Sequence, residues 1–351
     1  MAWLTYSDPF LTAALWIGLA AIALTALLVL QILVLRVRLR RREQRSERAV
    51  GRWRPVLAAA SANLVPPQLA RLSRADEADF IRLWLHFQAS LRGHAREGLN
   101  HVARVLDCAP VALRLLADGD RGERLLAILM LGHLGERAAI GQLRQIALRD
   151  DRLLALHAST ALVQIDAGFA AHDMAPELVN GNQWQVREVC NVLQGARAEC
   201  EPVLRAMLPA CAPDRLARLL QVLEGLRIVP SNAELAVLLR HVRFEVLVSA
   251  LRCVNDPQLR ADVLDLCAHP DWRVRMHAGK ALGRVGGRDD VEVLVGMLAD
   301  REWWVRYRTA QVLAGLPFVK PYELARIAAS HPDRYAADIL RQVGAENGMT
   351  L

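Results

Sequence analysis

The chain has 351 residues, of which 53% are hydrophobic but only 5% aromatic, and its formal net charge is +7. This proportion of apolar residues excludes an intrinsically disordered chain. Alanine, leucine and arginine favour helices, whereas the β-branched and aromatic residues that favour strands are thinly scattered here. We therefore expect an ordered, all-α protein.

The positive charge is concentrated in one short segment. Residues 36–54 contain nine arginines and two glutamates, a net charge of +7 that equals the excess of the whole chain. Residues 55–351 carry 35 basic and 34 acidic side chains. Because nucleic-acid-binding domains use a basic face to neutralise phosphates, this nearly neutral body argues against a nucleic-acid partner.

An uncharged apolar segment covers residues 11–35. At about 1.5 Å per residue, a helix of this length spans a hydrocarbon core of roughly 30 Å. We expect a retained transmembrane helix rather than a cleaved signal peptide, because the N-terminus lacks a basic region and arginines follow the apolar run. The other interpretation is a buried core helix.

Seven arginines close to the apolar segment predict its orientation. Basic residues beside a membrane span mark the cytoplasmic side. We therefore expect residues 1–10 outside, with Trp3, Tyr6 and Phe10 at the outer interface, and a cytoplasmic body anchored in a bacterial inner membrane. The arginines either set this topology alone or also contact anionic lipid. They are Arg36, Arg38, Arg40, Arg41, Arg42, Arg45 and Arg48.

Two further regions precede the repeats described below. Residues 36–67 are expected to form a basic juxtamembrane helix to about Arg52 and a linker, because Pro55 and the Pro66-Pro67 pair break helices. Residues 68–117 contain amphipathic helices, the first of them capped by Asp76. We interpret this second region as the N-terminal cap of a stacked array.

The six cysteines match no zinc-binding or iron–sulfur spacing and include no Cys-x-x-Cys pair. They lie among apolar residues at helical positions, where a free thiol behaves as a small hydrophobic group. We therefore expect core thiols in a reducing compartment and no bound metal. The cysteines are Cys108, Cys190, Cys200, Cys211, Cys253 and Cys267.

A sequence unit of about 31 residues recurs along the second part of the chain. Residues 124–135 and 275–286 share five identities at the same offsets. Each copy is followed by a second apolar segment, so each unit is predicted to be a helical hairpin. A single hairpin cannot cover its apolar face, which predicts a stacked α-solenoid. The small residues that mark the copies are Ala127, Ala158, Cys190, Gln221, a position near Val248, Ala278 and Thr309.

The unit resembles HEAT repeats, specifically the short HEAT-like type named after phycobilisome lyases. That pattern runs Asp, often Pro, Val-Arg, two residues, Ala, three residues and Leu-Gly. Residues 269–283 and 300–309 match it closely, and the resemblance covers roughly residues 118–345. It implies a right-handed-type HEAT-like α-solenoid of about seven repeats with a C-terminal cap over residues 118–351, preceded by the single transmembrane helix. We expect the glycine of Leu-Gly to end the helix in the left-handed conformation.

Aspartate and arginine side chains recur around the Val-Arg pair of the unit. In repeat proteins such residues link neighbouring turns by caps and charge-assisted hydrogen bonds. We interpret them as a structural ladder rather than as a ligand site. They are Asp271, Arg275, Asp300, Arg306 and Arg187.

Tryptophans precede the Val-Arg pair by two residues in three copies, at Trp184, Trp272 and Trp303. Stacking should place them along one edge of the solenoid. They either pack on the preceding repeat or form a contact surface, because aromatic and arginine side chains are enriched at binding hot spots. Neighbouring residues extend this candidate partner-binding surface: Trp304, Arg306, Tyr307 and Arg308.

Catalytic motifs are not found in the sequence: it lacks a phosphate-binding loop, a His-Glu-x-x-His pair and a Gly-x-Ser-x-Gly elbow. The Asp150-Asp151 and Asp289-Asp290 pairs are expected to cap helices. His157 and His277 are interpreted as partly buried repeat residues.

We therefore expect a non-catalytic membrane adaptor or scaffold that binds other proteins. No cofactor, nucleic acid or small-molecule substrate is expected. The resemblance leaves one alternative, a HEAT-like enzyme of the lyase or nucleic-acid-processing type.

Overall fold

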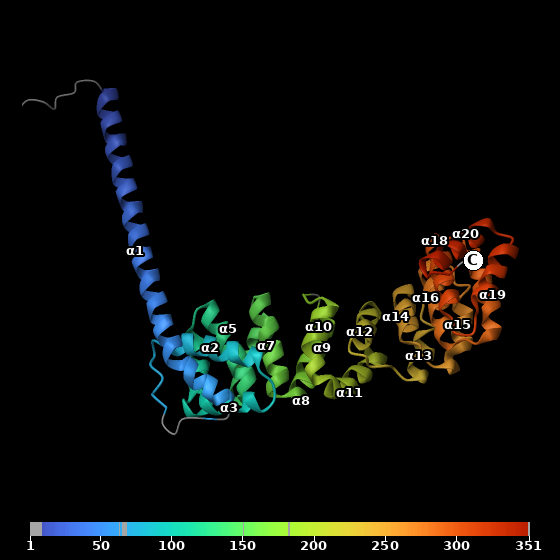
Figure 1. Ribbon diagram of the computed structural model, residues 1–351, viewed down its shortest axis with the longest axis horizontal. Helices are drawn as coiled ribbons and strands as arrows, with labels where there is room; N and C mark the ends of the chain where they lie inside the picture. Colours follow the sequence, from blue (N-terminus) through green and yellow to red (C-terminus); the bar gives the residue numbers. More distant parts are fainter. Residues whose placement is uncertain (1–8, 63, 65–68, 150, 182, 350–351) are drawn as a thin grey trace, which may run out of the picture. The chain divides into compact units, whose positions relative to one another are not determined.

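The structure is a computed structural model that describes residues 9–62, 64, 69–149, 151–181 and 183–349. Every regular element in these ranges is a helix, and they contain no β-strand. The chain divides into two compact units, Met1–Ile146 and Ala147–Leu351 (Figure 1). The prediction of an all-α protein is confirmed. Outside the described parts lie Trp3, Tyr6, Pro66, Pro67 and Asp150, and the side chains of Phe10 and Arg42.

The first unit begins with α1 (Pro9–Ser61), a helix of 53 residues. Its apolar part extends away from the other helices of this unit (Figure 1), and residues 13–35 are exposed. In the described residues, α1 is the one helix long and apolar enough to cross a membrane. Its most apolar stretch of 18 residues has a mean hydropathy of 2.6, and none of that stretch is buried. This half of α1 therefore has no protein partner within the described unit.

The C-terminal half of α1 is docked instead. A buried stripe at three- and four-residue steps packs it against α2 (Glu77–Ser90) and α3 (His94–Val105). This spacing places the buried side chains on one face of the helix. The stripe consists of Ala49, Trp53, Leu57 and Ala60.

Pro55 lies inside α1, so the predicted end of the basic helix near Arg52 is wrong. A proline ring removes one backbone N–H and crowds the carbonyl four residues earlier. The residue at that position is Gly51, and both Gly51 and Pro55 face solvent. Burial of Trp53 and Leu57 against the neighbouring helices outweighs the cost of the proline.

The region interpreted as a cap contains α2, α3 and α4 (Cys108–Asp118). The rings of Trp53 and Phe80 meet edge to face at 5.1 Å. The indole Nε1 of Trp84 donates a hydrogen bond to the Leu99 carbonyl at 2.9 Å. Asp76 precedes α2 as predicted, but its carboxylate makes no cap there and pairs with Arg52 of α1 at 3.2 Å.

The first repeat copy comprises α5 (Arg121–Leu134), a 3-10 turn η1 (Arg137–Ala139) and α6 (Ile140–Arg149). Asp120 caps α5 in a capping box with Glu123, and Gly135 ends it in the left-handed conformation at a φ of 70°. The division between the two units falls within α6.

The second unit alternates two series of helices. In the first series each helix contacts the next one in the series, and Figure 1 shows the members in succession. Contacts only between neighbouring repeats are the pattern of an α-solenoid. The first series is α7 (Arg152–Ile165), α10 (Val186–Leu193), α12 (Pro213–Gly225), α14 (Phe244–Cys253), α16 (Trp272–Val285), α18 (Trp303–Gly315) and α20 (Arg334–Glu346).

The second series lies between these helices in the sequence, and several of its members pack on the following helix of the first series. Short 3-10 turns precede three of these helices, and η4 (Leu208–Ala210) follows one of the three. The second series is α8 (Ala167–Phe169) with the π-helical turn η2 (Ala170–Met174) and α9 (Ala175–Asn180), then η3 (Gln194–Ala196) with α11 (Arg197–Met207), α13 (Asn232–Leu238), η5 (Pro257–Leu259) with α15 (Arg260–Leu266), η6 (Arg288–Asp290) with α17 (Val291–Met297), and α19 (Pro321–Ser330).

The residues that mark the copies lie on α5 and on the first series. Ala127, Ala158, Ala278 and Thr309 are buried, as small residues at helix contacts should be. In the fifth copy the fully buried small residue is Ala250 rather than Val248. Ala250 and Ala278 occupy the same position after the start of their helices, so the structure corrects the repeat register there.

The glycine of the Leu-Gly pair does not turn the chain in the best-matching repeat. Gly283 lies inside α16, and α16 ends two residues later. A Cβ at Gly283 would collide with Val312 of α18. The expectation of a helix-ending glycine is therefore wrong at this position, because close contact between α16 and α18 requires the missing side chain.

Candidate functional site

Trp184 is buried, with 4% of its surface exposed. Its backbone carbonyl accepts a hydrogen bond from Arg218 Nη2 of α12 at 2.7 Å. The prediction that Trp184 belongs to a partner-binding surface is therefore wrong, because this ring fills the core beside the start of α10. Trp272, the first residue of α16, is half-buried. The three tryptophans do not form one exposed edge.

Two adjacent exposed tryptophans begin α18, and the half-buried Tyr307 lies one turn later. Trp303 and Trp304 are 42% and 48% exposed. The Trp303 ring stacks on Tyr307, with centroids 4.9 Å apart and an interplanar angle of 9°. Trp303 and Trp304 meet edge to face at 4.8 Å. We call these three residues the α18 aromatic cluster.

Polar contacts hold the α18 aromatic cluster in place. The Tyr307 hydroxyl donates a hydrogen bond to Glu346 of α20 at 2.9 Å. The Arg308 guanidinium lies 5.8 Å from the Tyr307 ring centroid and donates to Gln311 Oε1 at 2.8 Å. The structure therefore brings together four of the predicted partner-binding residues: Trp303, Trp304, Tyr307 and Arg308.

Arg306 belongs to a different set of contacts. Its Nη1 donates to the carbonyls of Asp300 and Arg301, at 2.7 and 3.2 Å, at the start of its own helix. Its guanidinium also lies 5.7 Å from the ring centroid of Tyr335, an exposed residue on α20. Arg306 therefore holds the loop before α18 through two backbone carbonyls and contacts an aromatic ring of α20.

Tyr335 was not identified from the sequence. It is the second residue of α20, and Trp304 is the second residue of α18. An alignment that treated residues 334–346 as an eighth copy would place the two aromatic side chains at equivalent positions.

Positive charge surrounds the neighbouring part of α16. Burial, followed by the charges of Lys280, Arg252, Arg284 and Arg308, lowers the pKa of His277 to about 4, so this imidazole is neutral at pH 7. Burial and the nearby Arg308, Arg284 and Arg252 also lower the pKa of the exposed Lys280, although Glu224 opposes this shift. Arg252 is paired with Glu224 at 2.9 Å, so Lys280 and Arg308 are left on this side of the α18 aromatic cluster without a carboxylate partner in the described part of the chain.

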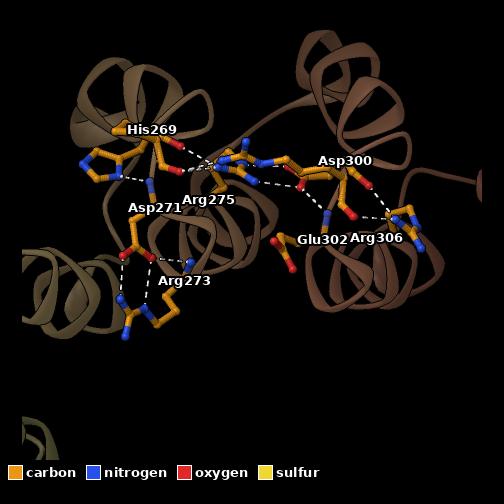
Figure 2. Close-up of polar contacts among 9 residues, drawn as sticks. His269, Asp271, Arg273, Arg275, Asp300, Glu302 and Arg306 are labelled. Carbon is orange, nitrogen blue, oxygen red and sulfur yellow. Dashed lines mark hydrogen bonds and ion pairs between the residues drawn. The ribbon is translucent and has the colours of Figure 1, made fainter.

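The predicted structural ladder is present between α16 and α18 (Figure 2). Arg275 donates from Nε and Nη2 to the Asp300 carboxylate at 2.6 and 2.8 Å. Its Nη1 reaches the carbonyls of His269 and Pro270 at 2.8 and 3.0 Å. The Arg275 and Asp300 side chains are only 9% and 8% exposed. This bidentate contact joins two consecutive repeats.

Burial alone would raise the pKa of Asp300. The hydrogen bonds from Arg275 and from the Glu302 backbone, together with the Arg275 charge, outweigh that effect and lower it. Asp300 is therefore ionised at neutral pH and structural in role.

Asp271 and Arg187 do not link repeats in this way. Asp271 accepts two hydrogen bonds from the Arg273 side chain, at 3.0 and 2.7 Å, within its own repeat (Figure 2). Arg187 is exposed. The adjacent Glu188 makes the link instead and accepts two hydrogen bonds from Arg152, at 2.6 and 2.7 Å.

One aspartate of each pair expected to cap a helix makes such a contact. Asp151 caps α7, and Asp290 accepts hydrogen bonds from Arg260 and from the Gly287 backbone. Burial lowers the pKa of His157. Burial also raises the pKa of the Cys108 and Cys267 thiols to about 12. Across the described residues, no group of three or more His, Cys, Asp or Glu is placed to hold a metal.

A family model of HEAT repeats matches residues 235–314, which run from α13 to the end of α18. The chain is therefore similar to HEAT repeats over this segment, and the whole of the α18 aromatic cluster lies within it. No curated protein matches the chain significantly. The match and the all-helical stacking support a HEAT-like repeat protein.

Proposed function

We propose that this protein is a non-catalytic adaptor, anchored in the inner membrane by α1, that binds an acidic segment of another protein. The contact surface is the α18 aromatic cluster together with Lys280 and Arg308. The observation that carries this proposal is the exposure of two adjoining tryptophans, Trp303 and Trp304, stacked against the half-buried Tyr307 and close to Arg308.

The chemistry of this surface favours a protein partner. HEAT repeats generally mediate protein–protein interaction, and a stacked array offers a surface that need not reorganise on binding. Tryptophan, tyrosine and arginine supply most hot spots at interfaces. Rings held by stacking and by the bond to Glu346 lose little conformational freedom when a partner covers them.

Membrane anchoring is supported by the exposed apolar part of α1 and by the arginines that follow it. Of these, Arg36, Arg38, Arg40, Arg41, Arg45 and Arg48 are all exposed. Their position predicts a cytoplasmic repeat region and an N-terminus outside. An anchor also raises the effective concentration of the adaptor for partners already at the membrane.

The topology can be tested with reporter fusions to full-length protein. A fluorescent protein fused to the C-terminus is expected to fluoresce, and a C-terminal alkaline phosphatase fusion is expected to be inactive, because that enzyme requires the periplasm. The protein should remain in the membrane pellet after carbonate extraction. An active phosphatase fusion would contradict the orientation, and release by carbonate would contradict the anchor.

The partner surface can be tested by affinity capture from detergent-solubilised membranes. We expect the wild-type protein to capture a partner that the Trp303→Ala/Trp304→Ala variant loses, because truncating hot-spot aromatics costs about 2 kcal/mol or more each. Tyr322→Ala is the matched control, since Tyr322 is an aromatic residue on α19 that is 70% exposed. Lys280→Glu/Arg308→Glu should weaken capture of an acidic partner in the same way.

The outcomes separate the adaptor from the alternative functions. Equal capture by the tryptophan variant and the Tyr322→Ala control would contradict the α18 aromatic cluster as the contact surface. Recovery of nucleic acid by the wild-type protein, lost in the same variant, would favour the nucleic-acid-processing alternative. Cross-linking of the captured partner should identify an acidic segment.

A further inference from the structure

A pocket of about 490 Å³ lies in the first unit, where α1 passes the start of α2. Five arginines and three acidic residues line it. Arg38, Arg41 and Arg45 come from α1, whereas Arg74 comes from the turn before α2 and Arg82 from α2 itself. Unlike the α18 aromatic cluster, this pocket belongs to the segment next to the proposed membrane span.

The acidic residues of this pocket already have partners. Asp79 accepts hydrogen bonds from Arg82 at 2.7 Å and from Ser46 at 3.2 Å. Glu77 accepts one from Arg114 at 2.5 Å. Glu123 is engaged in the capping box of α5, where it accepts from the Asp120 backbone at 3.0 Å.

Four arginines of the pocket form no ion pair with a described residue, and the whole lining carries five arginines against three carboxylates, a net charge of +2. Within the described residues, no acidic side chain lies within salt-bridge distance of Arg38, Arg41, Arg45 or Arg74. Guanidinium groups bind phosphate through paired, charge-assisted hydrogen bonds. A concave site with four such groups and no free carboxylate is complementary to a phosphate-bearing anion.

The arrangement of the arginines on α1 follows from its docked face. Arg38, Arg41 and Arg45 are three and four residues apart, so they share one face of the helix. The next steps along this face reach Ala49 and Trp53, which are buried in the cap. Arg36 and Arg40 lie on the opposite side of α1. Docking of the helix therefore directs one subset of the arginines over the pocket.

The location selects a lipid as the source of the phosphate. Arg38, Arg41 and Arg45 are three, six and ten residues beyond the apolar segment, about 4.5, 9 and 15 Å along a helix, so the pocket begins at the depth of the lipid headgroups. Anionic headgroups are attracted to basic residues at this position. We propose that this pocket binds the phosphate of an anionic phospholipid headgroup, an inference that rests on the proposed membrane anchoring by α1.

The test compares full-length variants in vesicles of phosphatidylcholine alone and in vesicles that also contain phosphatidylglycerol. Retention of fluorescent phosphatidylglycerol is measured for the wild type, Arg38→Gln/Arg41→Gln and Arg36→Gln/Arg40→Gln. Both variants remove two charges from the same segment. Loss of paired guanidinium contacts predicts that the first variant binds the lipid at least about tenfold more weakly than the second.

A second variant keeps this test independent of topology. Arg74→Gln changes a pocket residue that comes from the turn before α2. Arg74 is outside the segment that orients the span. We expect it also to weaken retention of phosphatidylglycerol, while carbonate extraction still finds every variant in the membrane. Release of the wild type by carbonate would contradict the anchor itself, which is a different failure.

Three results would overturn the proposal. Equal losses in the two paired variants would show diffuse attraction rather than a site, as would full retention by Arg74→Gln. Displacement of the lipid by glycerol phosphate at the same phosphate concentration would assign the pocket to a soluble phosphate ester instead of a membrane lipid.

Discussion

At the residue scale, the choice of arginine over lysine explains much of this structure. Only two of the 44 basic residues are lysines. Arg284 donates to two carbonyls of the preceding repeat, Leu251 at 2.6 Å and Val254 at 2.9 Å. Arg275 satisfies one carboxylate and two carbonyls at once. The flat guanidinium, with five donors, can join several acceptors in a way that an ammonium group cannot.

The Arg275–Asp300 pair is expected to be one of the most important polar contacts for stability. Asp300→Ala leaves a nearly buried guanidinium without its carboxylate, so unfolding in denaturant should show a loss of about 3 kcal/mol. Arg341→Ala, which breaks an exposed pair with Asp338, should cost less than about 1 kcal/mol. Equal losses in these two variants would contradict the structural ladder.

The same pair predicts how stability depends on pH. Because folding lowers the pKa of Asp300 below its ordinary value of 3.8, this carboxylate stabilises the protein fully above that value. The contribution is lost as the pH falls through the folded pKa. The difference in unfolding free energy between the wild type and Asp300→Ala should stay constant from pH 7 to about 4 and shrink at lower pH. A difference in unfolding free energy that grows on acidification would contradict this prediction.

Replacing each of two glycines by alanine is expected to change the stability of the protein in opposite directions. Gly283→Ala places a methyl group against Val312 of α18 and should destabilise the protein by about 1–3 kcal/mol. Gly296→Ala in α17 meets no atom within 4 Å, so the better helix propensity of alanine should stabilise it by about 0.5–1 kcal/mol. Thermal unfolding of both variants checks the assignment, and stabilisation by Gly283→Ala would refute the close helix contact.

At the element scale, α1 combines two environments in one helix. Its first part is apolar and exposed, and its last part is buried in the cap. Continuity through Pro55 couples the proposed membrane span directly to the folded body. Any force or tilt on the span would therefore reach α2 and α3 through a helix rather than through a flexible linker.

Replacing Pro55 by alanine is expected to stabilise the cap. Pro55 is exposed, so the substitution loses no packing. A proline in a helix interior costs about 3 kcal/mol relative to alanine. Slower amide hydrogen exchange across residues 49–61 should follow in Pro55→Ala, and faster exchange would show that α1 is not continuous there.

Local patterns predicted the repeats well, because the 31-residue period and the buried small residues reflect contacts that each repeat makes with its neighbour. Three features depended on packing that the sequence does not display. Trp184 is buried although Trp303, at the same motif position, is exposed. Pro55 is held inside a helix by burial of its neighbours. Gly283 is required by Val312, a residue 29 positions later, and not by a turn.

At the scale of the whole molecule, different residues of the second unit stabilise the repeats and form the proposed contact surface. Ion pairs join neighbouring repeats at several points along this unit, among them Arg152–Glu188, Arg260–Asp290 and Arg275–Asp300. The two tryptophans of the α18 aromatic cluster remain exposed near the end of the first series, where α20 is the one further member among the described helices. A surface built on a firmly joined array can hold its side chains ready for a partner without reorganisation.

The most direct test places a photo-crosslinking amino acid at position 304 in full-length protein and irradiates intact cells. Position 322, which is also aromatic and is more exposed but lies on α19, provides the comparison. We expect a cross-link from position 304 to an acidic segment of a membrane-associated protein, and no such product from position 322. The same products from both positions, or none from position 304, would contradict a partner-binding role for α18.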